Sequence, residues 1–302
     1  MTWTLVLHGG SGAMRRGRLS VEDDAAARAG LNAALDRGSA ILAGGGSALD
    51  AVEAAACVLE DDPAFNAARG AVLTQAGGHS LDAAIMDGAD VRAGAVAGST
   101  VTRHPISLAR ATLTIGPHVF LSGDGADEFA REQGLEQVAP DWFTTPERHR
   151  QWQELNATGT FDAELKYGTI GVVARDEKGR LAAATSTGGL TGKRWGRIGD
   201  SPVIGAGTWA DGAVAVSATG SGEHFLRLGL AHEIAARVRL AGDTPAAATD
   251  RVMTALDAIG GKGGVIVVGA EGGLWRYSTP GMYRARADAA GARVVAIYDD
   301  ED

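Results

Sequence analysis

The chain has 302 residues, of which 45% are hydrophobic and 22% charged, and its formal net charge is −9, from 37 Asp and Glu against 28 Lys and Arg. This composition is typical of a soluble globular protein. The acidic balance and the lack of clustered Lys and Arg argue against a nucleic-acid or anionic-membrane surface. No apolar run reaches the ~18 residues that a membrane span needs, and the first residues do not resemble a signal peptide. A single cysteine, Cys57, cannot form a disulfide within the chain, so we expect a cytoplasmic protein.

The first half of the chain predicts both strands and capped helices. Residues 2–8 predict a strand that enters a glycine turn at residues 8–12. Ser20 and Ser47, each followed three residues later by Asp, predict the N-caps of two helices, and glycines 44–46 separate them. Pro105 predicts the first turn of a short helix. Short apolar or alternating runs predict further strands at residues 71–74, 81–86 and 91–97.

The second half is separated from the first by a polar stretch from about residue 128 to 166, and its part from about 140 to 168 is the best candidate for a linker. Helices are expected over residues 223–240 and after Thr244-Pro245. A hairpin turn is expected at Lys178-Gly179. Strands are expected at residues 169–174, 181–187, 213–219, 265–268, 274–277 and 293–298. Strands and helices thus come in blocks, which favours a layered α+β fold over a Rossmann domain or a barrel.

Common catalytic motifs are missing from the sequence. There is no complete G-x-G-x-x-G, no G-x-S-x-G and no P-loop, and His232-Glu233 lacks the second histidine of a zinc-protease helix because Ala236 stands there. What remains is an unusual density of threonine and glycine in the second half. The segments are Gly168-Thr169-Ile170-Gly171, Thr185-Ser186-Thr187-Gly188-Gly189, and Thr219-Gly220-Ser221-Gly222-Glu223. Each segment alone has a structural explanation, since threonine favours strands and glycine favours turns.

Taken in order, these segments closely resemble the plant-type asparaginase and isoaspartyl peptidase family of N-terminal-nucleophile hydrolases. The resemblance covers nearly the whole chain. Besides the threonine-glycine segments, it includes His8-Gly9-Gly10-Ser11-Gly12, Phe65-Asn66-Ala67, Leu81-Asp82, Met86-Asp87-Gly88, Gly196-Arg197-Ile198-Gly199-Asp200 and Gly205-Ala206-Gly207. It implies a four-layer αββα sandwich formed by residues 1–302 as a single domain.

The resemblance also implies that the chain cuts itself between Gly168 and Thr169. The products would be an α chain, residues 1–168, and a β chain, residues 169–302, which form a dimer of αβ pairs. Glycine before the cut suits the strained backbone that attack on the preceding carbonyl requires. The cut frees the α-amine of Thr169. Its ordinary pKa of about 7.7 to 8.0 lets it act as the base that activates the threonine hydroxyl.

Roles for further residues follow from the same resemblance. Thr187 would polarise the Thr169 hydroxyl, and Thr219 and Gly220 would bind the oxyanion. Arg197 and Asp200 would hold the substrate's α-carboxylate and α-amine, a pairing of opposite charges that makes electrostatic sense. The remaining substrate-binding positions would be Asn66, Ile198, Gly199, Ser221 and Gly222. No metal site on side chains and no cofactor is implied. A structural sodium ion is implied on the main-chain carbonyls of Leu59, Glu60, Asp62, Phe65, Ala67 and Arg69, in a loop where Ala68 replaces the family's usual glycine.

The function implied is hydrolysis of β-aspartyl (isoaspartyl) peptides and of L-asparagine, with release of L-aspartate. Two alternatives stay open at this stage. A glycosylasparaginase shares the fold, although Thr187-Gly188-Gly189 and Thr219-Gly220-Ser221-Gly222 match the asparaginase branch better. A non-catalytic module that binds small anions on glycine turns would have no reason to split before Thr169. His104 before Pro105, and Gly192 after Thr191, also depart from the family pattern, which often has asparagine there.

Overall fold

The computed structural model describes residues 2–158 and 168–301. The larger of two sheets contains β1 (Thr4–Gly12), β2 (Leu81–Asp87), β3 (Arg92–Ser99), β4 (Phe120–Ser122), β5 (Ile170–Arg175), β6 (Leu181–Thr187), β11 (Gly281–Asp288) and β12 (Arg293–Tyr298). Their order is β12-β11-β1-β5-β6-β2-β3-β4, and only the β3–β4 pair is parallel. The smaller sheet contains β7 (Thr208–Ala210), β8 (Val214–Gly220), β9 (Gly263–Gly269) and β10 (Gly272–Tyr277), in the order β10-β9-β8-β7.

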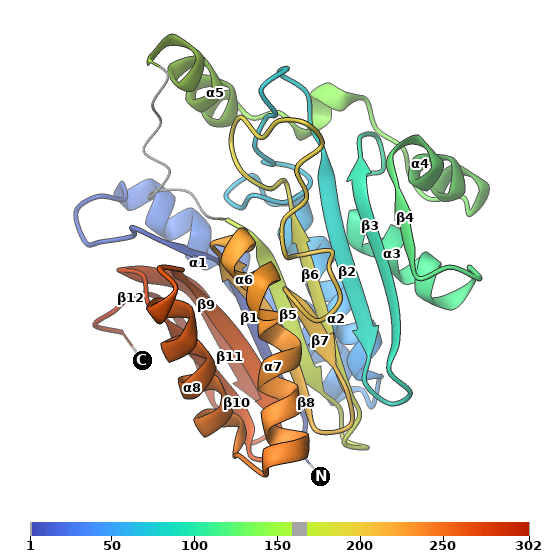
Figure 1. Cartoon of the computed structure of the whole chain (residues 1–302), viewed down its shortest axis with the longest axis vertical. Coiled ribbons are helices and arrows are strands. Elements are labelled where there is room, and N and C mark those ends of the chain that lie inside the picture. The colour runs from blue at the N-terminus through green and yellow to red at the C-terminus, as the bar shows by residue number, and fades with distance from the viewer. Residues whose placement is uncertain (1, 159–167, 302) are drawn as a thin grey trace.

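Helices cover the outer face of each sheet (Figure 1). On the larger sheet lie α1 (Val21–Ala43), α2 (Ala48–Asp61), α3 (Pro105–Thr114) and α4 (Gly123–Glu132), and on the smaller sheet lie α6 (Gly222–Leu228), α7 (Leu230–Ala236) and α8 (Pro245–Ala258). The inner faces of the sheets pack on each other, with β1, β5 and β6 against β8 and β9. The four layers, helix on sheet on sheet on helix, confirm the αββα fold expected from the sequence.

Local sequence explains several of these elements. The hydroxyls of Ser20 and Ser47 accept hydrogen bonds from the backbone N–H of Asp23 and Asp50, as predicted for helix N-caps. The Thr244 hydroxyl caps α8 in the same way. Strands β5 and β6 are buried on both faces, apart from Arg175 at the end of β5, because helices cover one side and the second sheet covers the other. The predicted cut lies immediately before β5, and β6 ends in the predicted partner threonine, Thr187.

The glycine segment at residues 8–12 is not a turn, as we had expected from the sequence, but the second half of β1. The register of β1 against β11 shifts between His8 and Gly10, so Gly9 forms a bulge. A side chain at Gly9 would collide with the ring of Phe65, which explains glycine in a strand at this point.

Other expectations need correction. Residues 71–74, of which the first three are buried, form no strand, and the sequence did not predict β4, β7 and β11. The expected helix over residues 223–240 is divided, because Gly229 adopts a left-handed conformation between α6 and α7, and a π-helix, Arg237–Ala241, follows. The linker candidate is partly folded: Pro140–Phe143 is a 3-10 helix, α5 (Pro146–Thr158) follows, and the rest up to residue 167 lies outside the described residues. In the described part of the chain, no helix is long and apolar enough to cross a membrane.

Candidate active site

Thr169 and Thr187 meet at the same end of two neighbouring strands. Thr169 directly precedes β5, Thr187 ends β6, and Ile170 lies opposite Ser186 in the antiparallel register. The Thr169 hydroxyl donates a hydrogen bond to the Thr187 hydroxyl over 3.2 Å. The Thr187 oxygen also accepts a hydrogen bond of 3.0 Å from the backbone N–H of Gly189. The sheet register thus brings together the predicted nucleophile and its predicted partner.

His8 contacts the backbone of Thr169 and the second sheet. Its Nδ1 lies 3.0 Å from the Thr169 carbonyl oxygen and its Nε2 lies 3.0 Å from the Ser217 hydroxyl on the second sheet. Burial lowers the pKa of His8 to about 3, so the ring is neutral at physiological pH. A carbonyl oxygen only accepts hydrogen bonds, so Nδ1 carries the proton and Nε2 accepts from Ser217. Gly171 leaves the space for this contact, because a Cβ there would collide with both the Ser217 oxygen and the His8 ring.

Arg197 and Asp200 lie beside the threonine pair, where they line a small pocket together with Thr169, Thr187 and Gly220. The close approach of these two side chains depends on glycine. A Cβ on Gly222 would come within 2.8 Å of the Asp200 carboxylate, and a Cβ on Gly199 within 2.9 Å of the Arg197 guanidinium. The pocket therefore offers a cationic fork and a carboxylate next to the Thr169 hydroxyl.

Asp200 is poised to pair with a positive charge. It is buried, and its Oδ2 makes no hydrogen bond to any residue that the structure describes. Burial raises the pKa of Asp200 to about 7, although the nearby Arg197 acts in the opposite direction. An ammonium group of a ligand would supply the missing partner and favour the charged form.

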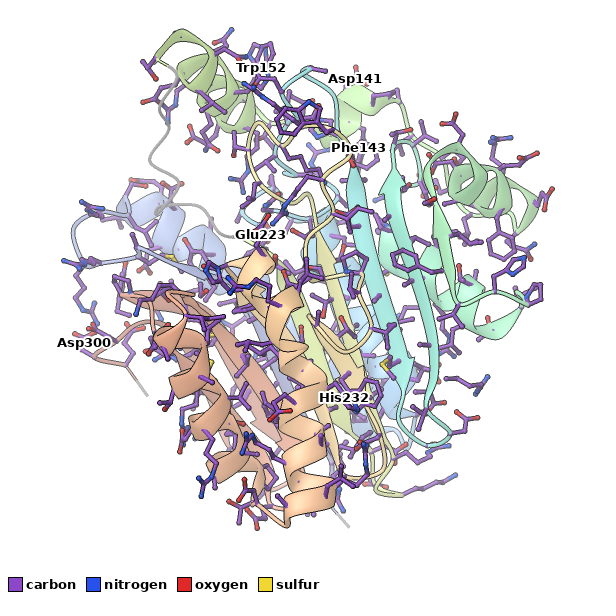
Figure 2. The ribbon with its side chains drawn as sticks, viewed as in Figure 1. Asp141, Phe143, Trp152, Glu223, His232 and Asp300 are labelled. Atoms are coloured by element: carbon purple, nitrogen blue, oxygen red, sulfur yellow. The ribbon has the colours of Figure 1, made fainter. Side chains whose placement is uncertain are left out.

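The Arg197 fork already binds a carboxylate. Glu223, in the first turn of α6, accepts hydrogen bonds from Arg197 Nε at 2.8 Å and Nη2 at 3.0 Å, and Figure 2 shows it at the upper end of that helix. This contact holds the pKa of Glu223 below its ordinary value. In this geometry the Arg197 guanidinium donates two parallel hydrogen bonds to one carboxylate. In the sequence, Glu223 stands at the end of the motif Thr219-Gly220-Ser221-Gly222-Glu223, and the resemblance implied no role for it.

Thr219 and Gly220 lie at the predicted strand end, where β8 stops before α6. The Thr219 hydroxyl is buried and has no hydrogen-bond partner among the described residues. Gly220 has a φ of 147°, a conformation that favours glycine. Because α6 has only seven residues, its helix dipole is small. The groups available here to donate hydrogen bonds to a negatively charged oxygen are the Thr219 hydroxyl and the adjacent backbone N–H.

Asn66 shapes the site and its side chain is fully engaged. Its Nδ2 donates to the Gly189 carbonyl at 2.8 Å and its Oδ1 accepts from the Val72 backbone N–H at 2.9 Å. It therefore fixes the glycine loop that in turn donates to Thr187. Asn66 also packs against Gly168, where an added Cβ would lie 2.7 Å from the Asn66 Cβ, so a side chain before the predicted cut would not fit.

The loop predicted to hold sodium curls after α2. The Glu60 carbonyl accepts a hydrogen bond of 2.8 Å from the Arg69 N–H, and the Asp62 carbonyl accepts one of 3.3 Å from the Phe65 N–H. Each carbonyl oxygen retains a second lone pair with which it could bind a cation. Ala68 has a φ of 39°, the left-handed region in which the family's usual glycine is favoured. The ion itself stays a prediction.

Two other predicted substrate-binding residues are Ile198 and Ser221. Ile198 is 41% exposed, and the Ser221 hydroxyl accepts a hydrogen bond from the Lys262 N–H at 3.1 Å. Neither lines the pocket that Thr169 shares with Arg197, and the same holds for Asn66, Thr219 and Gly222, so the roles of these five residues stay predictions. The residues that sequence reasoning missed are His8, Ser217 and Glu223. Only His8 and Glu223 stood in quoted motifs, and nothing in the sequence pairs Ser217 with a histidine 209 positions away.

The fold is that of the N-terminal-nucleophile hydrolases: two packed sheets with helices on both outer faces. The pair of threonines at the ends of two central strands fits this class. The chain belongs to the asparaginase family: a family model described as "Asparaginase" matches residues 1–297. It is 45% identical to the isoaspartyl peptidase of Salmonella typhimurium, over 97% of this chain and 98% of that protein. It is 42% identical to the isoaspartyl peptidase of Escherichia coli, over 98% and 96%. The human isoaspartyl peptidase/L-asparaginase is 40% identical, over 89% and 87%.

Proposed function

We propose that this protein is a threonine hydrolase that cleaves itself before Thr169 and then hydrolyses isoaspartyl peptides and L-asparagine, with release of L-aspartate. The observation that carries the proposal is the 3.2 Å contact of the Thr169 and Thr187 hydroxyls in a pocket that also contains Arg197 and Asp200. Similar relatives named as isoaspartyl peptidases support the choice of substrate.

The substrate's charged groups match the pocket. A free β-aspartyl residue or asparagine carries an α-carboxylate and an α-ammonium. The Arg197 fork would bind the carboxylate, displacing or sharing the place of Glu223, and buried Asp200 would bind the ammonium. This places the β-carbonyl toward Thr169.

The reaction requires the cut, because the nitrogen of Thr169 is an amide in the intact chain and gains basicity only as a free amine. The amine accepts the proton of the Thr169 hydroxyl as its oxygen attacks the β-carbonyl. Thr219 and Gly220 stabilise the oxyanion, and the amine passes the proton to the departing amine or ammonia. Water then attacks the β-aspartyl ester, which frees L-aspartate and restores the threonine. A sodium ion in the loop after α2 would fix the backbone around Asn66.

The test compares the wild-type protein with Thr169→Ala by intact mass and activity. We expect the wild type to give two chains, 1–168 and 169–302, and to hydrolyse β-Asp-Leu and asparagine. Thr169→Ala stays one chain and loses activity, whereas Thr254→Ala, on the exposed side of α8, behaves as wild type. An intact wild type with full activity, or cleavage at this bond in Thr169→Ala, would overturn the nucleophile assignment. Turnover of sugar-linked asparagine alone would indicate a glycosylasparaginase, and no turnover at all a binding module.

We also propose a dimer of αβ pairs in the cytoplasm, without nucleic-acid or membrane partners. The dimer follows from family membership alone. Sedimentation equilibrium tests it, since a dimer of pairs has twice the mass of one chain and a single pair has the mass of one.

A further inference from the structure

A cluster of three potential metal ligands lies on the helix side of the larger sheet, away from the pocket of Thr169. Cys57 and Glu60 project from the same side of α2, three residues apart, and His104 immediately precedes α3 as its N-cap residue. A thiol, a carboxylate oxygen and an imidazole nitrogen of these residues all lie within 4.8 Å of one another. The function proposed above uses none of these side chains.

Glu60 is the member of the cluster whose hydrogen bonding is incomplete. Its side chain is fully buried, and its Oε1 accepts hydrogen bonds from the Ser186 hydroxyl at 2.5 Å and the Ile106 N–H at 3.0 Å. Its Oε2 is equally buried but has no hydrogen-bond partner in the described parts of the chain. A buried carboxylate oxygen without a partner is costly, and a cation would satisfy it.

We propose that Cys57, Glu60 and His104 bind a Zn²⁺ ion. Thiolate, imidazole and carboxylate are the ligands that zinc takes in proteins, at about 2.3 Å for sulfur and about 2.0–2.2 Å for nitrogen and oxygen. Tetrahedral ligands at these distances lie about 3.3–3.7 Å apart, so small side-chain rotations would bring the three donors into range. Water takes the fourth position. The Cys57 thiol gives up its proton to solvent as the sulfur–zinc bond forms.

The surroundings fit such a site. His104 Nε2 lies 3.0 Å from Asp61 Oδ1 without forming a hydrogen bond in this structure, so a small rotation of the ring would let this carboxylate orient a ligating histidine. The His104 side chain is 23% exposed, which gives the ion access from solvent. Through Glu60 the ion would join α2 and α3 to Ser186 of β6, the residue before Thr187. The role expected of the ion is therefore structural: it would stabilise the helix-covered side of β6, the strand that ends in Thr187.

The test uses the purified full protein after treatment with a chelator, with Zn²⁺ and the spectroscopic probe Co²⁺ as the metals. We expect one Zn²⁺ per chain by elemental analysis and calorimetry, and a rise in melting temperature on its addition. Co²⁺ should produce a near-ultraviolet thiolate-to-cobalt absorption band, which only Cys57 can provide because the chain has one cysteine. This band separates the proposed site from metal bound at the threonine pocket.

Two variants and one control complete the test. Cys57→Ser should abolish the thiolate band and, like His104→Asn, weaken Zn²⁺ binding at least tenfold. His118→Asn, which removes an exposed histidine outside the cluster, should bind as wild type. Absence of the thiolate band in the wild type, or unchanged Zn²⁺ affinity in both Cys57→Ser and His104→Asn, would overturn the proposal.

Discussion

At the scale of single residues, Thr219 offers the sharpest separation of binding from catalysis. Its buried hydroxyl lacks a partner, so Thr219→Val removes a polar group without breaking a described hydrogen bond. If the hydroxyl donates to the oxyanion, kcat should fall by about 10² to 10³, roughly 2.7–4 kcal/mol, with little change in KM. Steady-state kinetics on cleaved material checks this, with Thr254→Val as the control. A kcat within about threefold of wild type, a change in activation free energy under about 1 kcal/mol, would show that the Thr219 hydroxyl does not stabilise the oxyanion.

Asp200 predicts the pH dependence of substrate capture. Its pKa is about 7, so the carboxyl is neutral below that pH and cannot pair with an α-ammonium. We therefore expect kcat/KM for asparagine to fall as pH drops through about 7. The free α-amine of Thr169 also titrates in this range. Succinamate distinguishes the two groups because it lacks the α-amine of asparagine. The pH dependence of its kcat/KM should therefore show only the titration of the Thr169 amine. Identical profiles for the two substrates would contradict the role of Asp200.

At the scale of elements, the packing of β5 against the second sheet requires glycine at position 171. A Cβ on Gly171 would lie 2.3 Å from His8 Nε2, and closer still to the Ser217 oxygen. Gly171→Ala should therefore push β5 away from β8 and lower the free energy of unfolding by about 1–3 kcal/mol. It should also slow self-cleavage, because His8 holds the Thr169 carbonyl. Denaturant unfolding and intact mass measure the two effects, and Gly212→Ala, in open space, is the control. Equal stability of the two variants would show that the sheets adapt.

At the scale of the whole molecule, the predicted cut does not separate two bodies. The larger sheet takes β1, β2, β3 and β4 from residues before Thr169, and β5, β6, β11 and β12 from residues after it. β1 lies between β11 and β5, and β6 pairs with β2, so the two pieces interleave. We expect the cleaved protein to run as two bands on a denaturing gel but to elute with Thr169→Ala in native size exclusion. Elution of separated fragments would refute this.

The sequence by itself determined the layered fold class, the helix caps and the two threonines. These features depend on local chemistry: a serine three residues before an aspartate caps a helix wherever it lies, and antiparallel neighbours joined by a short hairpin have their register set by the turn. The ordered glycine and threonine segments also identified the family and the Arg197 and Asp200 pair.

Only the tertiary structure decided which of these groups touch. The Glu223 contact with Arg197, the His8 contact with Ser217 and the approach of His104 to Glu60 each join segments far apart in the chain. The glycines at residues 9–12 read as a turn locally, yet pairing with β11 makes them strand. Likewise, the Ser221 hydroxyl accepts a hydrogen bond from the Lys262 N–H, 41 positions further along the chain. Such contacts follow from sheet order and layer packing, which bring distant side chains together at distances that no spacing in the sequence encodes.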